Sequence, residues 1–221
     1  MFARVKNKAR RALFKALEQP FTGNQKLSRL GSHYGGWYIP ANSLNEGEIC
    51  YCAGVGEDIS FDEELVARYG ALVYSFDPTP RSKDYVDSRR TVVKFYDFGF
   101  WSEDTTLRFY APQNEGHVSH SVVNLQGTFD YFEGECKRVS SVMQLLGHDR
   151  LDLLKIDIEG AEYEVLQDLI NSGVRPRILC VEFDQPNPLR RVRRMLKQLR
   201  SNGFQVVKIE GWNVSMIYHG E

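Results

Sequence analysis

The dominant pattern along the chain is an alternation of short apolar runs with stretches whose apolar residues recur at helical spacing. The apolar runs cover residues 48–52, 71–76, 91–98, 151–158 and 177–183. The amphipathic stretches cover residues 59–70, 80–90, 140–147, 160–173 and 188–203. Strands that are apolar on both faces are typical of a parallel sheet with helices on both sides. The sequence therefore predicts an α/β fold with a mostly parallel sheet, closed by an antiparallel hairpin over residues 204–218.

Two segments depart from this alternation. Residues 2–18 predict a basic amphipathic helix, and residues 20–47 are rich in Gly, Ser, Asn and Tyr, which favours loop. Residues 99–138 show only short extended pieces, and an insertion of this kind on a rigid sheet is suited to shaping a substrate site. We therefore expect an N-terminal segment of basic helix and lid-like loop, 1–47, followed by one larger domain, 48–221.

Charge is distributed unevenly, although the total is nearly balanced. The 221 residues are 42% hydrophobic and 26% charged with a formal net charge of −1, which is ordinary for a soluble globular enzyme. Residues 1–15 contain six basic residues and no acid, and residues 190–200 repeat this excess. Solvated basic faces explain both stretches. The alternative for the first is peripheral contact with an anionic membrane surface through basic residues at 4–15. No nucleic-acid partner is expected.

The cysteines and the lack of a long apolar run favour a cytoplasmic protein. Cys50, Cys52, Cys136 and Cys180 have no zinc-ligand spacing, so we expect buried free thiols in a reducing compartment. No apolar run approaches the roughly 20 residues that cross a bilayer. The first residues also lack the apolar core of a secretory signal.

A glycine turn joins the first core strand to the next helix. Gly54 and Gly56 allow a ligand to approach the backbone closely, as nucleotide-binding turns do. A dinucleotide fingerprint needs a small residue where Ile59 stands, and the adjacent Glu57 and Asp58 would repel a pyrophosphate. A ligand with a ribose and a positive centre but no phosphate fits better, and S-adenosylmethionine has these features.

Asp77 follows the second core strand, 21 residues after Gly56. A carboxylate at this position can accept hydrogen bonds from both ribose hydroxyls. The alternative is a turn residue before Pro78, since Asp-Pro often begins turns. Together with the glycine turn, the ribose role is favoured.

Several motifs together resemble those of the FkbM-type methyltransferases, which are class I enzymes that use S-adenosylmethionine. The motifs are GVGEDISFDEEL, FDPTPRS, LRFYAP, HVSHSVVNLQ and LLKIDIEGAEYEVL, and they lie within residues 34–185. The resemblance implies a Rossmann-like, seven-stranded sheet with helices on both faces. It also implies methyl transfer to oxygen, since characterised members act mostly on hydroxyls of sugars or natural products, many of them encoded among genes for surface polysaccharides.

The resemblance also implies the residues of the cofactor site. By position they are Gly54, Val55, Gly56, Glu57, Asp58, Asp77, Pro78, Asp97, Phe98 and Gly99. The first five form the loop after the first strand, Asp77 holds the ribose, and the segment from Asp97 to Phe100 lies near the adenine. Many class I enzymes carry an acid two residues before the first glycine, where this chain has Cys52. Either Glu57 or Asp58 must then neutralise the ammonium group of the cofactor.

The reaction centre is expected at the ends of the fourth and fifth core strands. Asp157 and Glu159 end the LLKIDIEG segment, and Glu182 and Asp184 end the next strand. Neighbouring parallel strands lie about 4.8 Å apart, so the two pairs can converge. Such carboxylates could hold Mg²⁺, or could raise one another's pKa and leave one as a general base. A solvated acid in the first turn of a helix explains Glu162 equally well.

Histidines and an aromatic segment complete the candidates. His120 lies within a motif of the resemblance, and a histidine with a near-neutral pKa suits a base or substrate contact. The alternative for His120, and more so for His117, is a loop histidine with a local hydrogen bond. The segment HYGGWY, residues 33–38, suits a lid over the cofactor or a sugar, although packing of Trp37 onto the sheet is an equal alternative.

The sequence thus predicts an S-adenosylmethionine-dependent methyltransferase that acts on a hydroxyl of a sugar or glycan. Asp157, Glu159, His120 and Glu182 are the expected catalytic residues. One alternative is N-methylation of a peptide or small amine. Another is a Rossmann-type protein that binds a nucleotide without catalysis, which the acids of the expected reaction centre disfavour.

Overall fold

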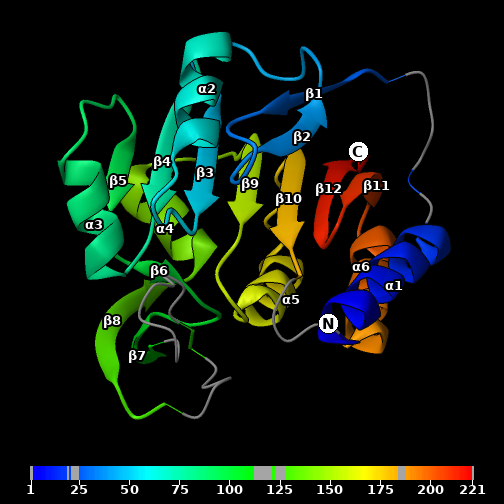
Figure 1. Ribbon diagram of the computed structural model, residues 1–221. Helices are drawn as coiled ribbons and strands as arrows, with labels where there is room; N and C mark the ends of the chain where they lie inside the picture. The colour runs from blue at the N-terminus through cyan, green and yellow to red at the C-terminus, as the bar shows by residue number, and fades with distance from the viewer. Residues whose placement is uncertain are drawn as a thin grey trace.

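A seven-stranded sheet forms the centre of the computed structural model (Figure 1). The structure describes residues 2–18, 20, 25–111, 121–122, 128–183 and 188–220, with side chains from residue 9 onward. The strand order is β11-β12-β10-β9-β3-β4-β5, and neighbouring strands from β10 to β5 pair in parallel.

The expected apolar runs form the parallel strands. They are β3 (Ile49–Ala53), β4 (Leu72–Phe76), β5 (Lys94–Tyr96), β9 (Leu153–Ile156) and β10 (Ile178–Glu182). The expected hairpin consists of β11 (Phe204–Glu210) and β12 (Asn213–Tyr218), and β12 pairs antiparallel with β10. The predicted seven-stranded, mostly parallel sheet with an antiparallel edge hairpin is confirmed.

Helices cover both faces of the sheet, as expected. The helices are α2 (Ser60–Tyr69), α3 (Pro80–Asp87), α4 (Val139–Leu146), α5 (Glu162–Ser172) and α6 (Leu189–Ser201). Apolar residues of α4, α5 and α6 pack in one core together with Tyr51 and Ala53, whereas α2 packs in a second core with Cys50 and Cys52. Successive residues of a strand point to opposite faces, so β3 contributes to both layers. All four cysteines are buried free thiols, as predicted.

The N-terminal segment contains more regular structure than expected. The basic helix forms as α1 (Phe2–Leu17), but residues 20–47 also contain β1 (Leu27–Leu30) and β2 (Trp37–Pro40), which pair antiparallel. The expectation of loop is wrong for these strands, because each is only four residues long and too short to show a clear alternation. Their buried side chains join the core on the α2 face. None of the described helices is long and apolar enough to cross a membrane.

The insertion forms a small sheet of its own. It consists of β6 (Gly99–Phe100), β7 (Thr105–Tyr110) and β8 (Tyr131–Lys137), in the order β6-β8-β7. The extended piece expected after residue 106 is therefore present in β7, whereas residues 112–120 and 123–127 lie outside the described part of the chain.

The order of strands reverses between β3 and β9, and their ends approach each other closely there. The Asp157 N–H donates to the Ala53 carbonyl oxygen at 3.2 Å. Gly54 has φ +83°, and a Cβ atom built on it would lie 1.6 Å from the Asp157 carbonyl oxygen. Packing within the protein therefore demands glycine at position 54, whatever ligand binds nearby.

We expect Gly54→Ala to lower the free energy of unfolding by about 3 kcal/mol or more, because the added methyl group must displace the backbone at Asp157. Gly147→Ala is the matched control, since Gly147 also has positive φ, +69°, but has no atom within 4 Å of the Cβ position. Gly147→Ala should lower the free energy of unfolding by about 1 kcal/mol, because only the strain of the left-handed backbone is added. Urea denaturation measures both, and equal losses would contradict the role of the close approach.

Candidate active site

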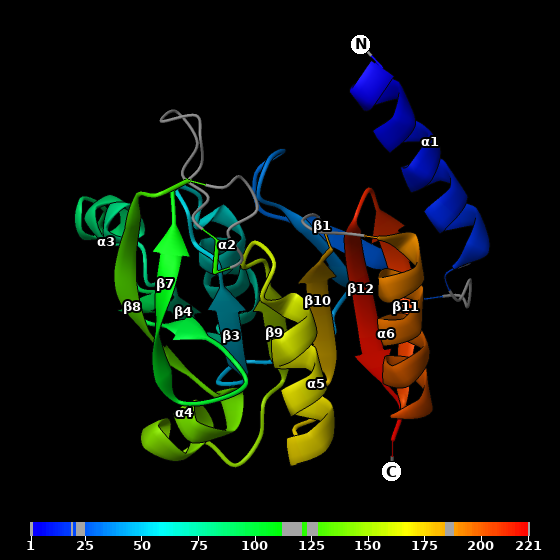
Figure 2. The same ribbon diagram turned by 90° about the horizontal axis from the view of Figure 1, so that it is seen from below.

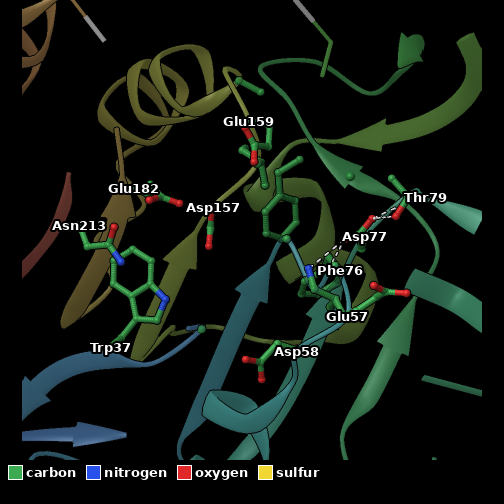
Figure 3. Close-up of a pocket in the computed structure, with 18 of the residues that line it drawn as sticks. Trp37, Glu57, Asp58, Phe76, Asp77, Thr79, Asp157, Glu159, Glu182 and Asn213 are labelled. Atoms are coloured by element: carbon green, nitrogen blue, oxygen red, sulfur yellow. Dashed lines mark hydrogen bonds between the residues drawn. The ribbon is translucent and has the colours of Figure 1, made fainter. Parts of the chain in front are cut away.

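A cavity of about 870 Å³ opens at the carboxyl ends of the parallel strands (Figure 3). Its walls include the residues that follow β3, β4 and β9, Glu182 at the end of β10, the turn between β11 and β12, and Tyr34 and Trp37. Ligands of open α/β sheets bind in this crevice, where the strand order reverses. The volume also suits a small-molecule site.

The cavity has two ends, with Asp157 between them in the view of Figure 3. Asp77 and Thr79 lie on the side of the glycine turn, whereas Glu182 and Asn213 lie on the other side. The former is the expected cofactor end, and the latter is available to an acceptor.

Asp77 orders the glycine turn. Its Oδ2 accepts hydrogen bonds from the N–H groups of Val55 and Gly56 at 2.9 and 3.0 Å. Its Oδ1 accepts from the N–H and the hydroxyl of Thr79 at 2.9 and 2.5 Å. The Asp77 side chain is buried, so these bonds fix the end of β4 to the turn after β3.

Gly56 has more space around it than Gly54. It has φ +54° and no atom within 4 Å of a Cβ position, so its backbone is open to a ligand.

The two acids of the turn have protein partners. Glu57 forms two hydrogen bonds with the Arg81 guanidinium, at 2.8 and 3.1 Å, and both side chains are substantially exposed. Asp58 accepts from the Ser32 hydroxyl at 2.5 Å and from the Ser60 N–H at 2.9 Å. Burial alone would raise the pKa of Asp58, but the bonds from Ser32 and Ser60 outweigh it and lower the pKa below its ordinary value.

Asp58 also ties the aromatic segment to the cofactor end. The Ser32 hydroxyl that binds Asp58 also accepts the N–H groups of Tyr34 and Gly35 at 3.0 and 2.9 Å. A Cβ atom at Gly35 would lie 2.7 Å from Asp58 Oδ2, so the two segments are in close contact. Burial, followed by the charges of Asp157 and Glu159, raises the pKa of Tyr34, which places this phenol in the electrostatic field of the reaction centre. These contacts agree with a segment that covers the site.

A buried lysine that the sequence analysis missed lies under the reaction centre. Lys155 Nζ donates to the Gly54 carbonyl oxygen at 2.5 Å and lies 3.5 Å from Asp157 Oδ2. Burial would lower the pKa of Lys155, but the carboxylates of Asp157 and Asp62 outweigh it and raise the pKa. A lysine within the apolar run LLKI is itself a signal, because a buried ammonium group requires partners.

Glu159 has a strained backbone beside the cavity. Its φ is +54°, in the left-handed region that costs a residue with a side chain about 1 kcal/mol or more. The Ser121 hydroxyl donates to the Glu159 carbonyl oxygen at 2.5 Å and so helps to hold this conformation. Asp157, Glu159 and Glu182 all line the cavity, so the expected acids of the two strands do meet there.

Glu162 is buried, and its interpretation as a solvated acid is wrong. Its carboxyl oxygens accept the Gly160 N–H at 2.9 and 3.1 Å and the Ile158 N–H at 3.3 Å, which fixes the loop that carries Glu159. Burial raises the pKa of Glu162 to about 8, although the bonds from Gly160 act in the opposite direction and Asp157 adds a smaller increase.

Only part of the segment expected at the adenine borders the cavity. Gly99 and Phe100 line the cavity together with Pro78. Asp97 is exposed and Phe98 is buried in the core, and neither belongs to the cavity wall. Phe100 belongs to the same core and is only 2% exposed, but it is the phenylalanine of this segment that borders the cavity.

Other predicted residues are not placed at the site. His120, His117 and Asp184 lie outside the described residues. Within the described part of the chain, no three or more Asp, Glu, His or Cys side chains form a group that could hold a metal ion. A Mg²⁺ site, one of the two roles open to the acids of these strands, is therefore not supported among Asp157, Glu159 and Glu182.

Comparison with known proteins is consistent with this geometry. The family model described as the methyltransferase FkbM domain matches residues 39–206. The chain is 28% identical over 134 residues to the probable methyltransferase-like protein 24 of Rattus norvegicus, and 27% identical over 134 residues to that of Homo sapiens. Each alignment covers 61% of this chain and 31% of the relative, so the chain matches about a third of the length of these proteins.

Among solved structures, the fold is similar to that of a fibrillarin pre-rRNA processing protein from Methanococcus jannaschii. The TM-score is 0.47 at 10% sequence identity, and the superposition covers 90% of this chain and 84% of the other.

We expect Glu162 to make stability fall as pH rises. Its pKa of about 8 in the folded protein lies above the ordinary value of 4.5, so folding retains a proton that the unfolded chain has released. This contribution is fully present below about pH 4.5 and is lost as pH rises through about 8. Glu162→Gln, which is neutral at every pH, should flatten the decline by up to about 1.4 kcal/mol per pH unit. Urea denaturation across this range measures the slope.

Glu164→Gln is the matched control, because Glu164 lies in the same first turn but is partly exposed and pairs with Arg191. A slope that stays the same in Glu162→Gln, or that flattens equally in Glu164→Gln, would contradict the assignment.

Proposed function

The chain belongs to the FkbM methyltransferase family, and from this premise we propose that it is an S-adenosylmethionine-dependent O-methyltransferase acting on a hydroxyl of a sugar or glycan. The observation that carries the proposal is Asp157, which lies on the wall of one cavity between the glycine turn and the acids and aromatic residues of the opposite end.

The cofactor end has the features that S-adenosylmethionine requires. The open backbone at Gly56 allows close approach, and Pro78, backed by the buried Phe76 and Phe100, borders the space for the adenine. Of the two acids in the turn, Glu57 is paired with Arg81, so Asp58 is the one whose negative charge favours a cationic ligand over a phosphate. When bound, this cofactor supplies an activated methyl group.

Asp77 can serve the ribose as well as the turn. Its four hydrogen bonds fill the roughly four acceptor positions of a carboxylate. One of the four is adjustable, because the Thr79 hydroxyl also lies 2.6 Å from the Ser82 hydroxyl and either can be the donor. Rotation of the Thr79 proton toward Ser82 would free Oδ1 of Asp77 for a ribose hydroxyl.

Asp157 is the residue best placed to accept the proton of the acceptor. A sugar hydroxyl loses its proton as it is methylated, and a carboxylate within reach promotes this step. The Lys155 ammonium group, 3.5 Å from Oδ2, holds the Asp157 side chain from below. Glu182, on the neighbouring strand, is available to orient the acceptor through a second hydroxyl.

The acceptor end combines aromatic and polar groups in the manner of a sugar site. Tyr34, which is 90% exposed, lines the cavity together with Glu182 and Asn213, whereas Trp37 and Trp212 border it from largely buried positions. Aromatic faces pack against the apolar face of a sugar ring, while carboxylates and amides accept or donate to its hydroxyls.

N-methylation of a small amine or peptide is the second candidate. Away from the glycine turn, the cavity is lined by Asp157, Glu159, Glu182 and Glu210, with Arg11 as a cation. This excess of carboxylates would attract an ammonium group, which needs only to lose a proton before methylation. A screen that includes amines beside neutral sugars separates the two candidates.

We expect the protein to bind S-adenosylhomocysteine and not NAD in a calorimetric titration. Asp77→Ala should abolish binding, because it removes the ribose acceptor and leaves the N–H groups of Val55 and Gly56 without their partner. Preference for NAD would contradict the proposal and favour a protein that binds a nucleotide without catalysis.

We expect Asp157→Asn to retain S-adenosylhomocysteine binding and to lose methyl transfer by about 10²-fold or more, the usual contribution of a general base. The measurement is transfer of a labelled methyl group to a panel of saccharides. Asp87→Asn, a change to an exposed acid of α3, is the control. Full activity of Asp157→Asn on an accepted saccharide would contradict the role of Asp157.

We expect Glu159→Gly to raise the free energy of unfolding by about 1 kcal/mol, because glycine adopts positive φ without strain. The same change should lower kcat/KM by removing a carboxylate from the cavity. Glu159→Gln separates the two effects, since it retains the strained backbone and should leave stability unchanged. A less stable Glu159→Gly protein would contradict the assignment of strain.

A further inference from the structure

Helix α1 is attached to the rest of the protein through one face. Phe14 is fully buried and stacks on Trp212 with ring centroids 5.2 Å apart, and the Arg10 guanidinium lies over the same indole. Glu18, just after the helix, is 3% exposed and accepts hydrogen bonds from Arg193 at 2.7 Å and Arg200 at 2.6 Å, both on α6. Phe14 and Glu18 are four residues apart, so they mark the attached side.

The opposite side of α1 carries an apolar stripe that the described part of the protein leaves exposed. The stripe consists of Ala9, Ala12, Leu13, Ala16 and Leu17. Leu13 is 50% exposed and Leu17 is 44% exposed. At about 100° of rotation per residue, the middle of this stripe faces away from the side that bears Phe14 and Glu18. A helix that packs only on its own domain buries its apolar stripe, whereas this helix turns it outward.

The charge of α1 indicates what the stripe contacts. Residues 1–17 contain six basic residues and no acid, and the exposed Lys15 lies within the last turn. A nucleic acid would match the charge but not the apolar stripe. A surface with anionic groups above an apolar interior matches both, and basic amphipathic helices bind bilayers in this way.

The arrangement of α1 allows such contact. Figure 2 shows the helix running away from the sheet, with its N-terminal end farthest from the other elements. Its middle lies beside the cavity, because Arg11 lines the acceptor end and its Nη1 is 3.5 Å from the position of a Cβ on Gly211. A surface that binds the stripe is therefore close to the mouth of the cavity.

We propose that α1 docks the protein on an anionic lipid bilayer, with the apolar stripe in the headgroup boundary and the basic residues against lipid phosphates. Docking in this form requires no membrane-spanning helix. It is independent of the reaction that the cavity performs, and it brings the acceptor end next to the membrane surface.

The test is sedimentation of the full chain with vesicles of phosphatidylcholine, alone or mixed with phosphatidylglycerol. We expect binding to the mixed vesicles, at least about tenfold weaker binding to phosphatidylcholine alone, and weakening by salt. The double variant Leu13→Glu/Leu17→Glu should lose at least about tenfold in binding. Leu145→Glu, at a leucine that is 62% exposed on α4, is the matched control and should bind as the unaltered protein does.

Urea denaturation of the double variant checks that it folds. If the double variant does not fold, Lys15→Glu replaces it, and Lys83→Glu on α3 is the control. Weaker vesicle binding by Lys15→Glu alone would support docking. Binding unaffected by the changes in α1, binding without preference for anionic lipid, or no binding would overturn the proposal. A dimer that the same double variant dissociates, without vesicle binding, would assign the stripe to a second copy of the chain instead. No methyl transfer enters this test, so its failure leaves the proposed reaction untouched.

Discussion

One buried ammonium group, that of Lys155, lies where the strand order reverses, and the site depends on it. It binds the Gly54 carbonyl oxygen in the cofactor turn and lies beside the Asp157 carboxylate. On the α2 side, the fully buried Asp62 has a pKa raised to about 6 by burial, and the charge of Lys155 opposes this rise. Carboxylates concentrated at one edge of a sheet repel one another, and a buried cation among them offsets part of that cost. Without Lys155, Asp157 would have no cation within an ion-pair distance in the described part of the chain.

The acids around the cavity form two groups, which differ in whether they fix the loops of the site. Asp58, Asp77 and Glu162 are engaged by backbone N–H groups or hydroxyls of the protein, so they fix the loops that end β3, β4 and β9. Asp157, Glu159 and Glu182 line the same cavity as Asp58 and Asp77, at the ends of β9 and β10. The pair of acids at the glycine turn is explained in this way. Glu57 and Asp58 are not placed against a phosphate, and each binds a neighbouring segment that shapes the site.

Periodicity was sufficient to predict the sheet because each core strand carries apolar residues on both faces, as β9 and β10 do. Periodicity did not predict β1 and β2, because a strand of four residues is too short for an apolar–polar alternation to be distinguished from chance. At the site, the glycine turn, Asp77 and the acids after β9 and β10 follow from their position at strand ends. Roles that depend on three-dimensional contact could not be predicted: the burial of Glu162 and the absence of Asp97 and Phe98 from the cavity wall depend on how loops fold back over the sheet. The necessity of Gly54 likewise comes from Asp157, which is far from it in sequence.

Trp212 is in contact with α1 and also borders the cavity. It lines the acceptor end of the cavity, and it also receives Phe14 and Arg10 of α1. The helix that presents its apolar stripe outward therefore supports, with its opposite face, one wall of the site. Asn213, the first residue of β12, follows Trp212 and also lines the cavity, so α1 packs directly behind this part of the wall. A partner on the stripe and an acceptor in the cavity would thus act on the same tryptophan from two sides.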